Sequence, residues 1–409
     1  MLVTFRFKNF GPFRDESVLD MRAIKSNKEH PYNVVHKYED MPLLKIAAIY
    51  GANASGKTNF MDAYICFRDI VTGSFQENNK DEDDSFLEQQ FYPFLLDTDS
   101  SSEDTEFEAV YRYDNTEYTY GFSFNRSCIS YEWLYRTALD TKRRVKTIIL
   151  ERSPDKIDLG PSVRKVCEKY IDEIDTDVLA LSFFSSLRLK VPYFYNVVYL
   201  VNSFLPVYLT KDSLASFSMQ RYFEKEFNPQ EKDRLLKFLH AIDIGIKDIS
   251  VEKNGNRVLV YTYHTDKDGE MVPFPIEIES DGTRRAIALY SMFSAALSMD
   301  KGLLLDEMHS QLHPLLQKYL LDLFYDHSNG AQLIYTTHDT TLLDAKYTRR
   351  DQIWFVSKDE MGASTLYSLS DFNVRKDQSY KKAYLSGLYG AIPNLKDFSL
   401  NGGTSDGEG

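Results

Sequence analysis

The chain has 409 residues, of which 43% are hydrophobic and 14% aromatic, so it is long and apolar enough to bury a large core. Its 61 acidic and 48 basic residues give a formal net charge of -13, which argues against a surface that attracts nucleic acid throughout. The three cysteines are widely spaced and suggest neither a zinc site nor a disulfide framework. With no signal-peptide core and no stretch of about 20 apolar residues, a cytoplasmic protein without a membrane anchor is expected.

The first elements expected along the chain are a strand, then a strand followed by a loop and a helix. Val3, Phe5 and Phe7 alternate with polar residues, as in a half-buried strand. The apolar run 45–50, KIAAIY, predicts a buried strand that enters a glycine-rich turn, and residues 59–70 have helical character. This order of elements is the setting of a phosphate-binding loop.

Residues 51–58, GANASGKT, fit the G-x-x-x-x-G-K-[ST] pattern of that loop. Its glycines let backbone N–H groups approach phosphate oxygens closely. Lys57 is expected to place its charge on the β- and γ-phosphates, and Thr58 to offer its hydroxyl to Mg²⁺. The alternative is an ordinary turn that opens a helix, which the preceding strand disfavours. The candidate nucleotide-binding residues are Gly51, Asn53, Ala54, Ser55, Gly56, Lys57, Thr58 and Asn59.

The middle of the chain predicts hairpins and helices. Residues 76–105 are acidic and serine-rich, as in a solvated loop. Alternation over 107–124 around Asp114-Asn115 predicts a β-hairpin. Mixed apolar and charged runs over 161–245 predict helices, and alternation over 248–278 predicts a second hairpin that turns at Asn254-Gly255.

Four regions are therefore expected. They are an N-terminal ATPase lobe at 1–150, a helical insert at 151–247, a C-terminal ATPase lobe at 248–400 and a disordered tail at 401–409. In the C-terminal lobe, helices at 283–299 and 314–325 alternate with short apolar strands at 302–305 and 332–336. Alternating strands and helices predict an α/β fold with a largely parallel sheet.

Two carboxylates follow the apolar strand at 302–305. Ligands bind where the strands of open α/β sheets end, so Asp306 is expected to hold Mg²⁺ and Glu307 to act on the attacking water. The alternative is a solvated acidic pair at a strand end. The next strand ends in His338, about thirty residues later, where it could contact the γ-phosphate and the attacking water; a structural histidine is the alternative.

With these motifs, the chain resembles ATPases of the ABC/SMC/RecF class, and more closely the bacterial abortive-infection family typified by AbiLii and RloA. The chain is also similar to AriA, the ATPase of the PARIS phage-defence system. The matching stretches are FRFKNFGPF, LLKIAAIYGANASGKTNFMDA, ESDGTRRAIAL, GLLLDEMHSQLHP, YTTHDTTLLD, DQIWFVSKDEMGASTLYSLSDF and YLSGLYGAIP. The resemblance implies an ABC/SMC-type P-loop NTPase head with a mixed sheet, an antiparallel β subdomain and an inserted helical subdomain.

The resemblance also implies a homodimer that sandwiches ATP and Mg²⁺ between two heads. Its signature segment then corresponds to Ser280, Gly282 and Thr283, although the chain departs from the LSGGQ pattern of transporters. Residues 310–313 match the position of the D-loop, and the 9–13 loop resembles the segment that lines the adenine pocket. Gln89 and Gln90 are candidates for the Q-loop. His309 and His313 could be mistaken for metal ligands, but a structural or interface role is favoured.

Three functions are compatible with these features. The first is an ATP-driven switch in anti-phage defence, responding to a phage-encoded trigger and controlling a separately encoded effector, expected to be a Toprim-type nuclease. This hypothesis admits a larger homo-oligomer. The second is a RecF- or SMC-like ATPase of DNA repair, which the acidic composition and the absence of a C-x-x-C hook disfavour. The third is the nucleotide-binding subunit of a transporter, which the altered signature disfavours. The basic run 142–146 could contact DNA, but a solvated hairpin end is favoured.

Overall fold

The structure is a computed structural model that describes residues 1–38, 40–77, 85–140, 143–187, 189–208, 212–254, 257–309, 312–375 and 378–393. Gly255 of the expected turn and the tail at 401–409 lie outside these residues. In the ranges that the structure describes, no helix combines the length and the apolar character needed to cross a membrane.

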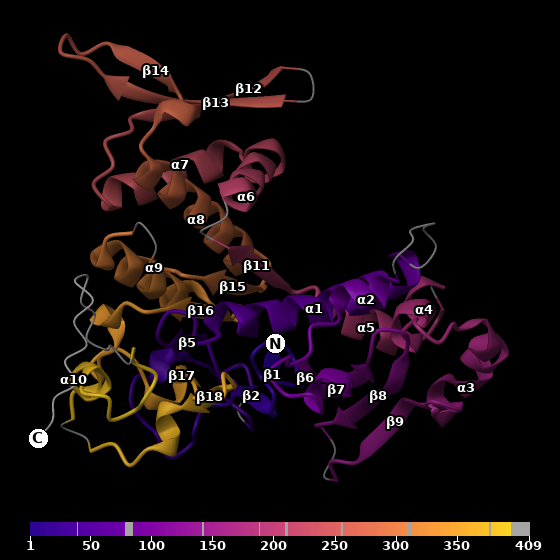
Figure 1. The fold of residues 1–409 in the computed structure, drawn as a ribbon. Coiled ribbons are helices and arrows are strands. Elements are labelled where there is room, and N and C mark those ends of the chain that lie inside the picture. The colour runs from indigo at the N-terminus through magenta and orange to yellow at the C-terminus, as the bar shows by residue number, and fades with distance from the viewer. Residues whose placement is uncertain are drawn as a thin grey trace, which may run out of the picture.

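A six-stranded sheet forms the centre of the fold (Figure 1). Its strands, in spatial order, are β11 (Phe204–Tyr208), β15 (Gly302–Asp306), β16 (Leu333–Thr337), β5 (Ile46–Tyr50), β17 (Ile353–Lys358) and β18 (Ser364–Ser368). The first five run parallel, and only the edge strand β18 is antiparallel to its neighbour. The carboxyl ends of β15, β16 and β5 therefore meet at one edge, as the sequence predicts.

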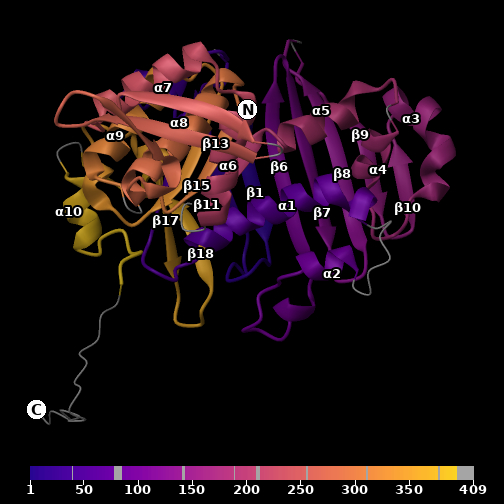
Figure 2. The same cartoon turned by 90° about the horizontal axis from the view of Figure 1, so that it is seen from above.

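A second, fully antiparallel sheet of seven strands lies beside the first (Figure 2). Its strands in spatial order are β10 (Lys156–Leu159), β9 (Lys146–Ser153), β8 (Ile129–Ala138), β7 (Thr116–Phe124), β6 (Thr105–Tyr113), β1 (Leu2–Lys8) and β2 (Ser17–Asp20). The predicted hairpin is formed by β6 and β7, with Asp114 in its turn at a φ of 50°.

Helix α1 (Lys57–Glu77) begins at the central sheet and extends over the antiparallel sheet (Figures 1 and 2). Its aromatic residues Phe60, Tyr64 and Phe67 share a buried cluster with Phe5 of β1 and with Ile49 of β5. The rings of Phe5 and Tyr64, for example, lie 5.1 Å apart. Because α1 packs on both sheets, its first turn is fixed relative to each of them.

The other face of the central sheet is covered by α8 (Asp281–Ser298), α9 (Pro314–His327) and α10 (Tyr380–Leu385). Successive residues of β5 explain why both faces are covered. Ala47 and Ile49 belong to the cluster that contains α1, whereas Ile46 and Ala48 belong to the cluster on the opposite face. A strand buried on both faces is continuously apolar, as the sequence of β5 is.

The helices of the region 151–247, where the sequence predicts a helical insert, pack against two different parts of the molecule. Its helices are α3 (Pro161–Cys167), α4 (Ala180–Ser186), α5 (Pro192–Val201), α6 (Asp212–Lys225) and α7 (Pro229–Ala241). The first three pack, together with the short α2 (Phe86–Gln90), in the cluster of α1, and the last two pack with α8. Between them β11 pairs with β15 of the central sheet. The chain therefore crosses from one cluster to the other at this strand.

A small antiparallel sheet projects beyond α6 and α7 (Figure 1). It consists of β12 (Asp248–Asn254), β13 (Arg257–Thr265) and β14 (Met271–Pro275). Glu279 joins this sheet to the start of α8, because its Oε1 lies 2.5 Å from Thr262 Oγ1 and 2.6 Å from His264 Nε2. A further pair, β3 (Val34–Val35) and β4 (Leu43–Leu44), forms a two-stranded ladder.

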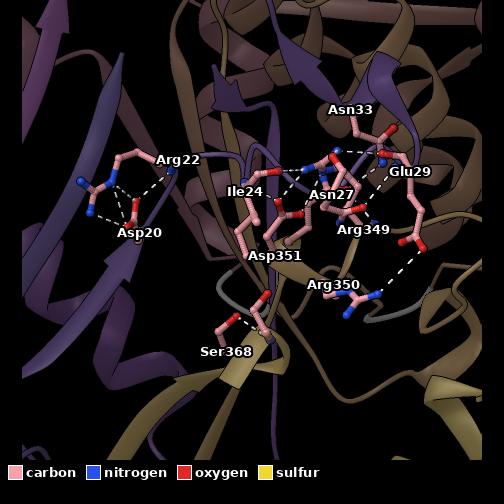
Figure 3. Close-up of polar contacts among 12 residues, drawn as sticks. Asp20, Arg22, Ile24, Asn27, Glu29, Asn33, Arg349, Arg350, Asp351 and Ser368 are labelled. Atoms are coloured by element: carbon pink, nitrogen blue, oxygen red, sulfur yellow. Dashed lines mark hydrogen bonds and ion pairs between the residues drawn. The ribbon is translucent and has the colours of Figure 1, made fainter. Parts of the chain in front are cut away.

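A buried ion pair holds the segment after β2 against the amino edge of the central sheet (Figure 3). Arg349 and Asp351 are 2% and 4% exposed, with Nη2 and Oδ2 2.6 Å apart. Arg349 also donates to the carbonyls of Asn27 and Glu29, and Asp351 accepts from the backbone N–H of Ile24. Since a buried pair needs hydrogen bonds to offset desolvation, these backbone contacts make it stable.

Candidate nucleotide-binding site

The loop at residues 51–56 joins the carboxyl end of β5 to the amino terminus of α1, which is the setting that its pattern requires. Gly56 has a φ of 111°, and a Cβ there would lie 2.8 Å from Ser364 Oγ. A Cβ on Gly51 would lie 2.5 Å from the carbonyl oxygen of Val356. Both positions therefore require glycine, and the loop presents its backbone at the positive end of a helix dipole.

A residue outside the loop, Ser364, helps to hold it in place. Ser364, at the start of β18, donates from Oγ to the carbonyl oxygen of Ser55 at 2.6 Å. Its own N–H donates to the carbonyl oxygen of Pro12 at 2.7 Å. No local pattern predicts this role of Ser364, because its contact joins segments more than 300 residues apart. Asn53 and Ala54 stay exposed at the tip of the loop, and Ala54 has a φ of 60°.

Lys57 is buried beneath the loop. Its Nζ donates to the carbonyl oxygens of Gly51 and Ala52 at 2.9 and 2.8 Å. Burial lowers the pKa of the ammonium group, and the carboxylates of Asp306 and Glu307 act in the opposite direction. The side chain is thus close to the loop and to both carboxylates.

Thr58 and Asp306 come together although they lie 248 positions apart in sequence. Thr58 Oγ1 donates to Asp306 Oδ2 at 2.9 Å, and Thr336 Oγ1 donates to Asp306 Oδ1 at 2.5 Å. A threonine hydroxyl beside a carboxylate offers the hard oxygen ligands that Mg²⁺ prefers. The donor set therefore fits a magnesium ion bound together with phosphates.

Glu307 follows β15 and is only partly buried. Its φ of 53° lies in the left-handed region, which is uncommon for a residue with a side chain. The backbone N–H of Glu307 donates to Thr336 Oγ1 at 2.8 Å. Backbone strain of this kind persists where neighbouring contacts hold it, and it is frequent at active sites.

His338 is exposed at the end of β16, with its ring centroid 3.7 Å from that of His309. His309 Nδ1 lies 3.1 Å from Thr337 Oγ1. Burial, with a smaller effect of His338, lowers the pKa of His309 to about 4, so its ring is neutral near pH 7. The sequence did not anticipate this pair, because a turn that follows β15 brings His309 back onto the next strand end.

His313, the expected D-loop and the Q-loop candidate Gln90 are the next residues to be placed. His313 caps α9, since its Nδ1 accepts from the backbone N–H of Leu315 at 3.2 Å, which supports a structural role. Residues 310 and 311 of the expected D-loop lie outside the described ranges.

The Q-loop candidate Gln90 lies beside α1. Its carbonyl oxygen accepts from Cys66 Sγ at 3.4 Å. Cys66 lies nine residues into α1, about 13 Å along its axis from Lys57, so this candidate lies away from the phosphate loop.

The signature-like segment is exposed at the amino terminus of α8. Ser280 caps the helix, because its Oγ accepts from the N–H of Thr283 at 3.1 Å. A Cβ on Gly282 would meet only Ser280 Oγ, at 3.9 Å, so the fold of one chain does not require glycine there. Figure 1 shows this end of α8 beside the β12–β14 sheet, and the side chain of Ser280 bonds to the hydroxyl and the N–H of Thr283.

The 9–13 loop borders the phosphate loop. Asn9 is fully buried, and its side chain bonds to the backbone of Phe94, Ser100 and Glu103, which is a structural role. Pro12 lies beside Gly56, where a Cβ would approach its Cγ to 3.3 Å. Asn59 lies beside Gly11, where a Cβ would lie 3.5 Å from Asn59 Nδ2. A pocket of about 310 Å³ opens next to this loop and is lined by Gly11, Pro12, Tyr92, Leu95, Arg126 and Lys358, among others.

Comparison with known proteins gives one family match. The model of the AAA domain described as "putative AbiEii toxin, Type IV TA system" matches residues 46–344, a range that contains the phosphate loop, the signature-like segment, Asp306, Glu307 and His338. No curated protein matches the chain.

Three solved structures are similar in fold. An SMC head bound to the C-terminal winged-helix domain of ScpA has 16% identity and a TM-score of 0.44, covering 93% of this chain and 99% of that one. The SMC head domain of Thermotoga maritima has 13% identity and a TM-score of 0.41, covering 90% and 98%. An SMC head with an extended coiled coil, bound to the C-terminal domain of ScpA from Pyrococcus furiosus, has 15% identity and a TM-score of 0.38, covering 95% and 99%.

Proposed function

Because the chain belongs to the family of AAA domains described as putative AbiEii toxins of type IV toxin–antitoxin systems, we propose that this P-loop ATPase is the nucleotide-driven switch of an anti-phage defence system. In this proposal it hydrolyses ATP to ADP and phosphate with Mg²⁺, and it controls a separately encoded effector. The effector is a Toprim-type nuclease, and a phage-encoded molecule acts as the trigger.

The observation that carries the ATPase proposal is the hydrogen bond between Thr58 and Asp306. It joins the end of the phosphate loop to the acidic strand end, which is the geometry that binds a nucleotide and its metal ion. Mg²⁺ held by these two residues supplies positive charge to the phosphates. Lys57 and the N–H groups of the loop supply the remaining donors.

Glu307 and His338 are the proposed catalytic residues. The carboxylate of Glu307 orients and deprotonates the attacking water, and its ionised form is the one that can accept a proton. His338 donates a hydrogen bond to the γ-phosphate. Its contact with the neutral ring of His309 keeps the His338 ring in that orientation.

The base of the nucleotide is proposed to occupy the pocket lined by Gly11, Pro12 and Tyr92. Gly11 and Pro12 line this pocket, and a Cβ on Gly56 of the phosphate loop would lie 3.3 Å from Pro12 Cγ. Its apolar walls suit the faces of an adenine ring.

A second copy of the chain is proposed to complete the site. Ser280, Gly282 and Thr283 lie at an exposed helix amino terminus, where N–H groups can contact an anion. Because a Cβ on Gly282 would meet open space within one chain, the glycine is explained if a partner approaches there. A homodimer with two ATP molecules in its interface follows, and such dimers can build a larger homo-oligomer.

The functional proposal is tested by expression of the chain with the neighbouring gene in bacteria challenged with phage. Protection that depends on both genes, and that Lys57→Ala or Glu307→Gln removes, is expected. Protection that survives both substitutions would contradict an ATP-driven switch. Purified protein supplies the biochemical arm, in which phosphate release requires Mg²⁺ and Lys57.

A further inference from the structure

Thr336 occupies a central position among the proposed catalytic groups, although it is not one of the candidate site residues expected from the sequence. It lies in β16, two residues before His338, and is fully buried. Its hydroxyl contacts both acidic residues at the end of β15, since it donates to Asp306 Oδ1 at 2.5 Å and accepts from the N–H of Glu307 at 2.8 Å.

The two partners of Thr336 Oγ1 determine which bond the hydroxyl donates and which it accepts. A threonine hydroxyl has one hydrogen to donate, and an amide N–H can only donate. Since the N–H of Glu307 fills an acceptor position on Oγ1, the hydroxyl hydrogen is free to point to Asp306. The carbonyl of Thr336 adds a third bond by accepting from the N–H of Met308 at 3.1 Å. One residue of β16 therefore contacts three consecutive residues, from the last residue of β15 to Met308.

We propose that Thr336 is a positioning residue for ATP hydrolysis, whose hydroxyl sets the orientation of Asp306 and the backbone conformation of Glu307. This inference rests on the proposed ATPase function. The bond to Asp306 Oδ1 leaves Oδ2 directed at Thr58 and the metal site. The bond from Glu307 holds its backbone at a φ of 53°, and the carboxylate direction depends on that dihedral angle.

The same hydroxyl also links two strand ends that carry different parts of the reaction. Asp306 ends β15 and Glu307 follows it, whereas His338 follows β16. A displacement of β16 therefore changes the position of both carboxylates as well as that of the histidine. Thr336 thus keeps the proposed base, the metal ligand and the γ-phosphate contact in one arrangement.

Two substitutions separate this role from simple packing. Thr336→Val keeps the shape of the side chain and removes both hydrogen bonds, whereas Thr336→Ser keeps the hydroxyl and removes a methyl group. Positioning predicts that kcat falls about 10- to 100-fold in the valine variant, because small displacements of catalytic groups have effects of that size. It predicts a kcat within about threefold of the original for the serine variant, with KM little changed in both.

A packing role predicts the reverse order, with valine tolerated and serine damaged, and that result would overturn the proposal. Thr348→Val is the matched control, because Thr348 is also buried and makes one hydrogen bond to the carbonyl of Leu342. This control should keep the original kcat. If the valine variant does not fold, Thr336→Ala and Thr336→Ser provide the same comparison of a lost and a kept hydroxyl.

Hydrogen exchange at the Glu307 amide, measured without nucleotide, gives a readout that is independent of hydrolysis. The amide should exchange at least about tenfold faster in the valine variant and at the original rate in the serine variant, because exchange requires loss of the bond to Oγ1. Unchanged exchange in the valine variant would overturn the proposal. If the original protein releases no phosphate from ATP, the proposed function fails, whereas the exchange result still decides what Thr336 holds.

Discussion

The phosphate loop and the signature-like segment differ in how completely a single chain supports them. Around Lys57 and Thr58, contacts from β15, β16 and β18 hold the loop and the acidic residues in place. At Ser280–Thr283 the bonds are local and the glycine is not required by its surroundings. One chain therefore contains an organised half of the proposed nucleotide site, and it exposes the segment that we propose as the other half of the site in a second copy. Substitutions in the two regions should therefore have different consequences.

The largest effect is expected at the organised half. Lys57→Ala removes the cation that lies beneath the loop, and ATP binding should weaken at least about 100-fold because the β- and γ-phosphates lose a charged partner. Calorimetric titration of ATP in the presence of Mg²⁺ measures this. Circular dichroism serves as the control for folding. An unchanged dissociation constant would contradict the assignment of the phosphate loop.

Glu307→Gln should separate binding from hydrolysis in the same region. The amide fills the same space but cannot accept the proton of water, so kcat should fall at least about 100-fold while ATP affinity changes little. Phosphate release and nucleotide titration on one preparation give both values. Turnover at the original rate would show that another group is the base.

Gly282→Gln tests the exposed segment. Since space is available within one chain, the variant should fold and bind ATP with affinity within about threefold of the original. The bulk of glutamine should block association, lowering turnover at least about tenfold. Light scattering with ATP, on Glu307→Gln protein with and without the Gly282 change, compares the masses. Equal assembly would remove this segment from the interface.

The smallest effect concerns pH. Burial lowers the pKa of His309 to about 4, below its usual value near 6.5, so between these values the unfolded chain binds more protons than the folded one. The contribution of neutral His309 to the free energy of unfolding is therefore fully present above pH 6.5, and it is lost as the pH falls from 6.5 to about 4.

His309→Gln should therefore reduce the acid sensitivity of the unfolding free energy. Because His309 is only half-buried, the difference between pH 7.5 and pH 5 should change by about 1 kcal/mol or less. Urea denaturation at the two pH values tests this, with His313→Gln as the exposed control. Equal acid sensitivity of the original and the His309 variant would show that His309 is not held neutral by burial.

The parts of the fold that the sequence predicted are those with local signals. The apolar strands β5, β15 and β16 and the loop pattern at 51–58 each lie within a few residues, so their periodicity and glycines were sufficient. The strand β11 was missed because it is short and contains Pro206 within a region rich in helical patterns. Its identity as a strand depends on pairing with β15, nearly 100 residues later.

The same reasoning explains the limits at the candidate site. The sequence predicted Asp306, Glu307 and His338 from strand ends, but it could not predict that Thr336 bonds to two of them. It also gave no sign of Ser364 beneath the loop. These residues act through lateral contacts between strands, which a linear pattern does not contain.

The central claim is that each complete site combines the phosphate loop of one copy with the signature-like segment of another. Mixing two inactive variants tests it, because a dimer of Lys57→Ala with Gly282→Gln contains one site in which both halves are intact.

Each variant alone should retain at most about a tenth of the original ATP turnover, and an equal mixture, unfolded and refolded together, should exceed the sum of the separate activities. The upper limit is about a quarter of the original turnover, reached when half of the dimers are mixed and each has one of its two sites complete. A mixture that shows only the sum of the separate activities would contradict the claim.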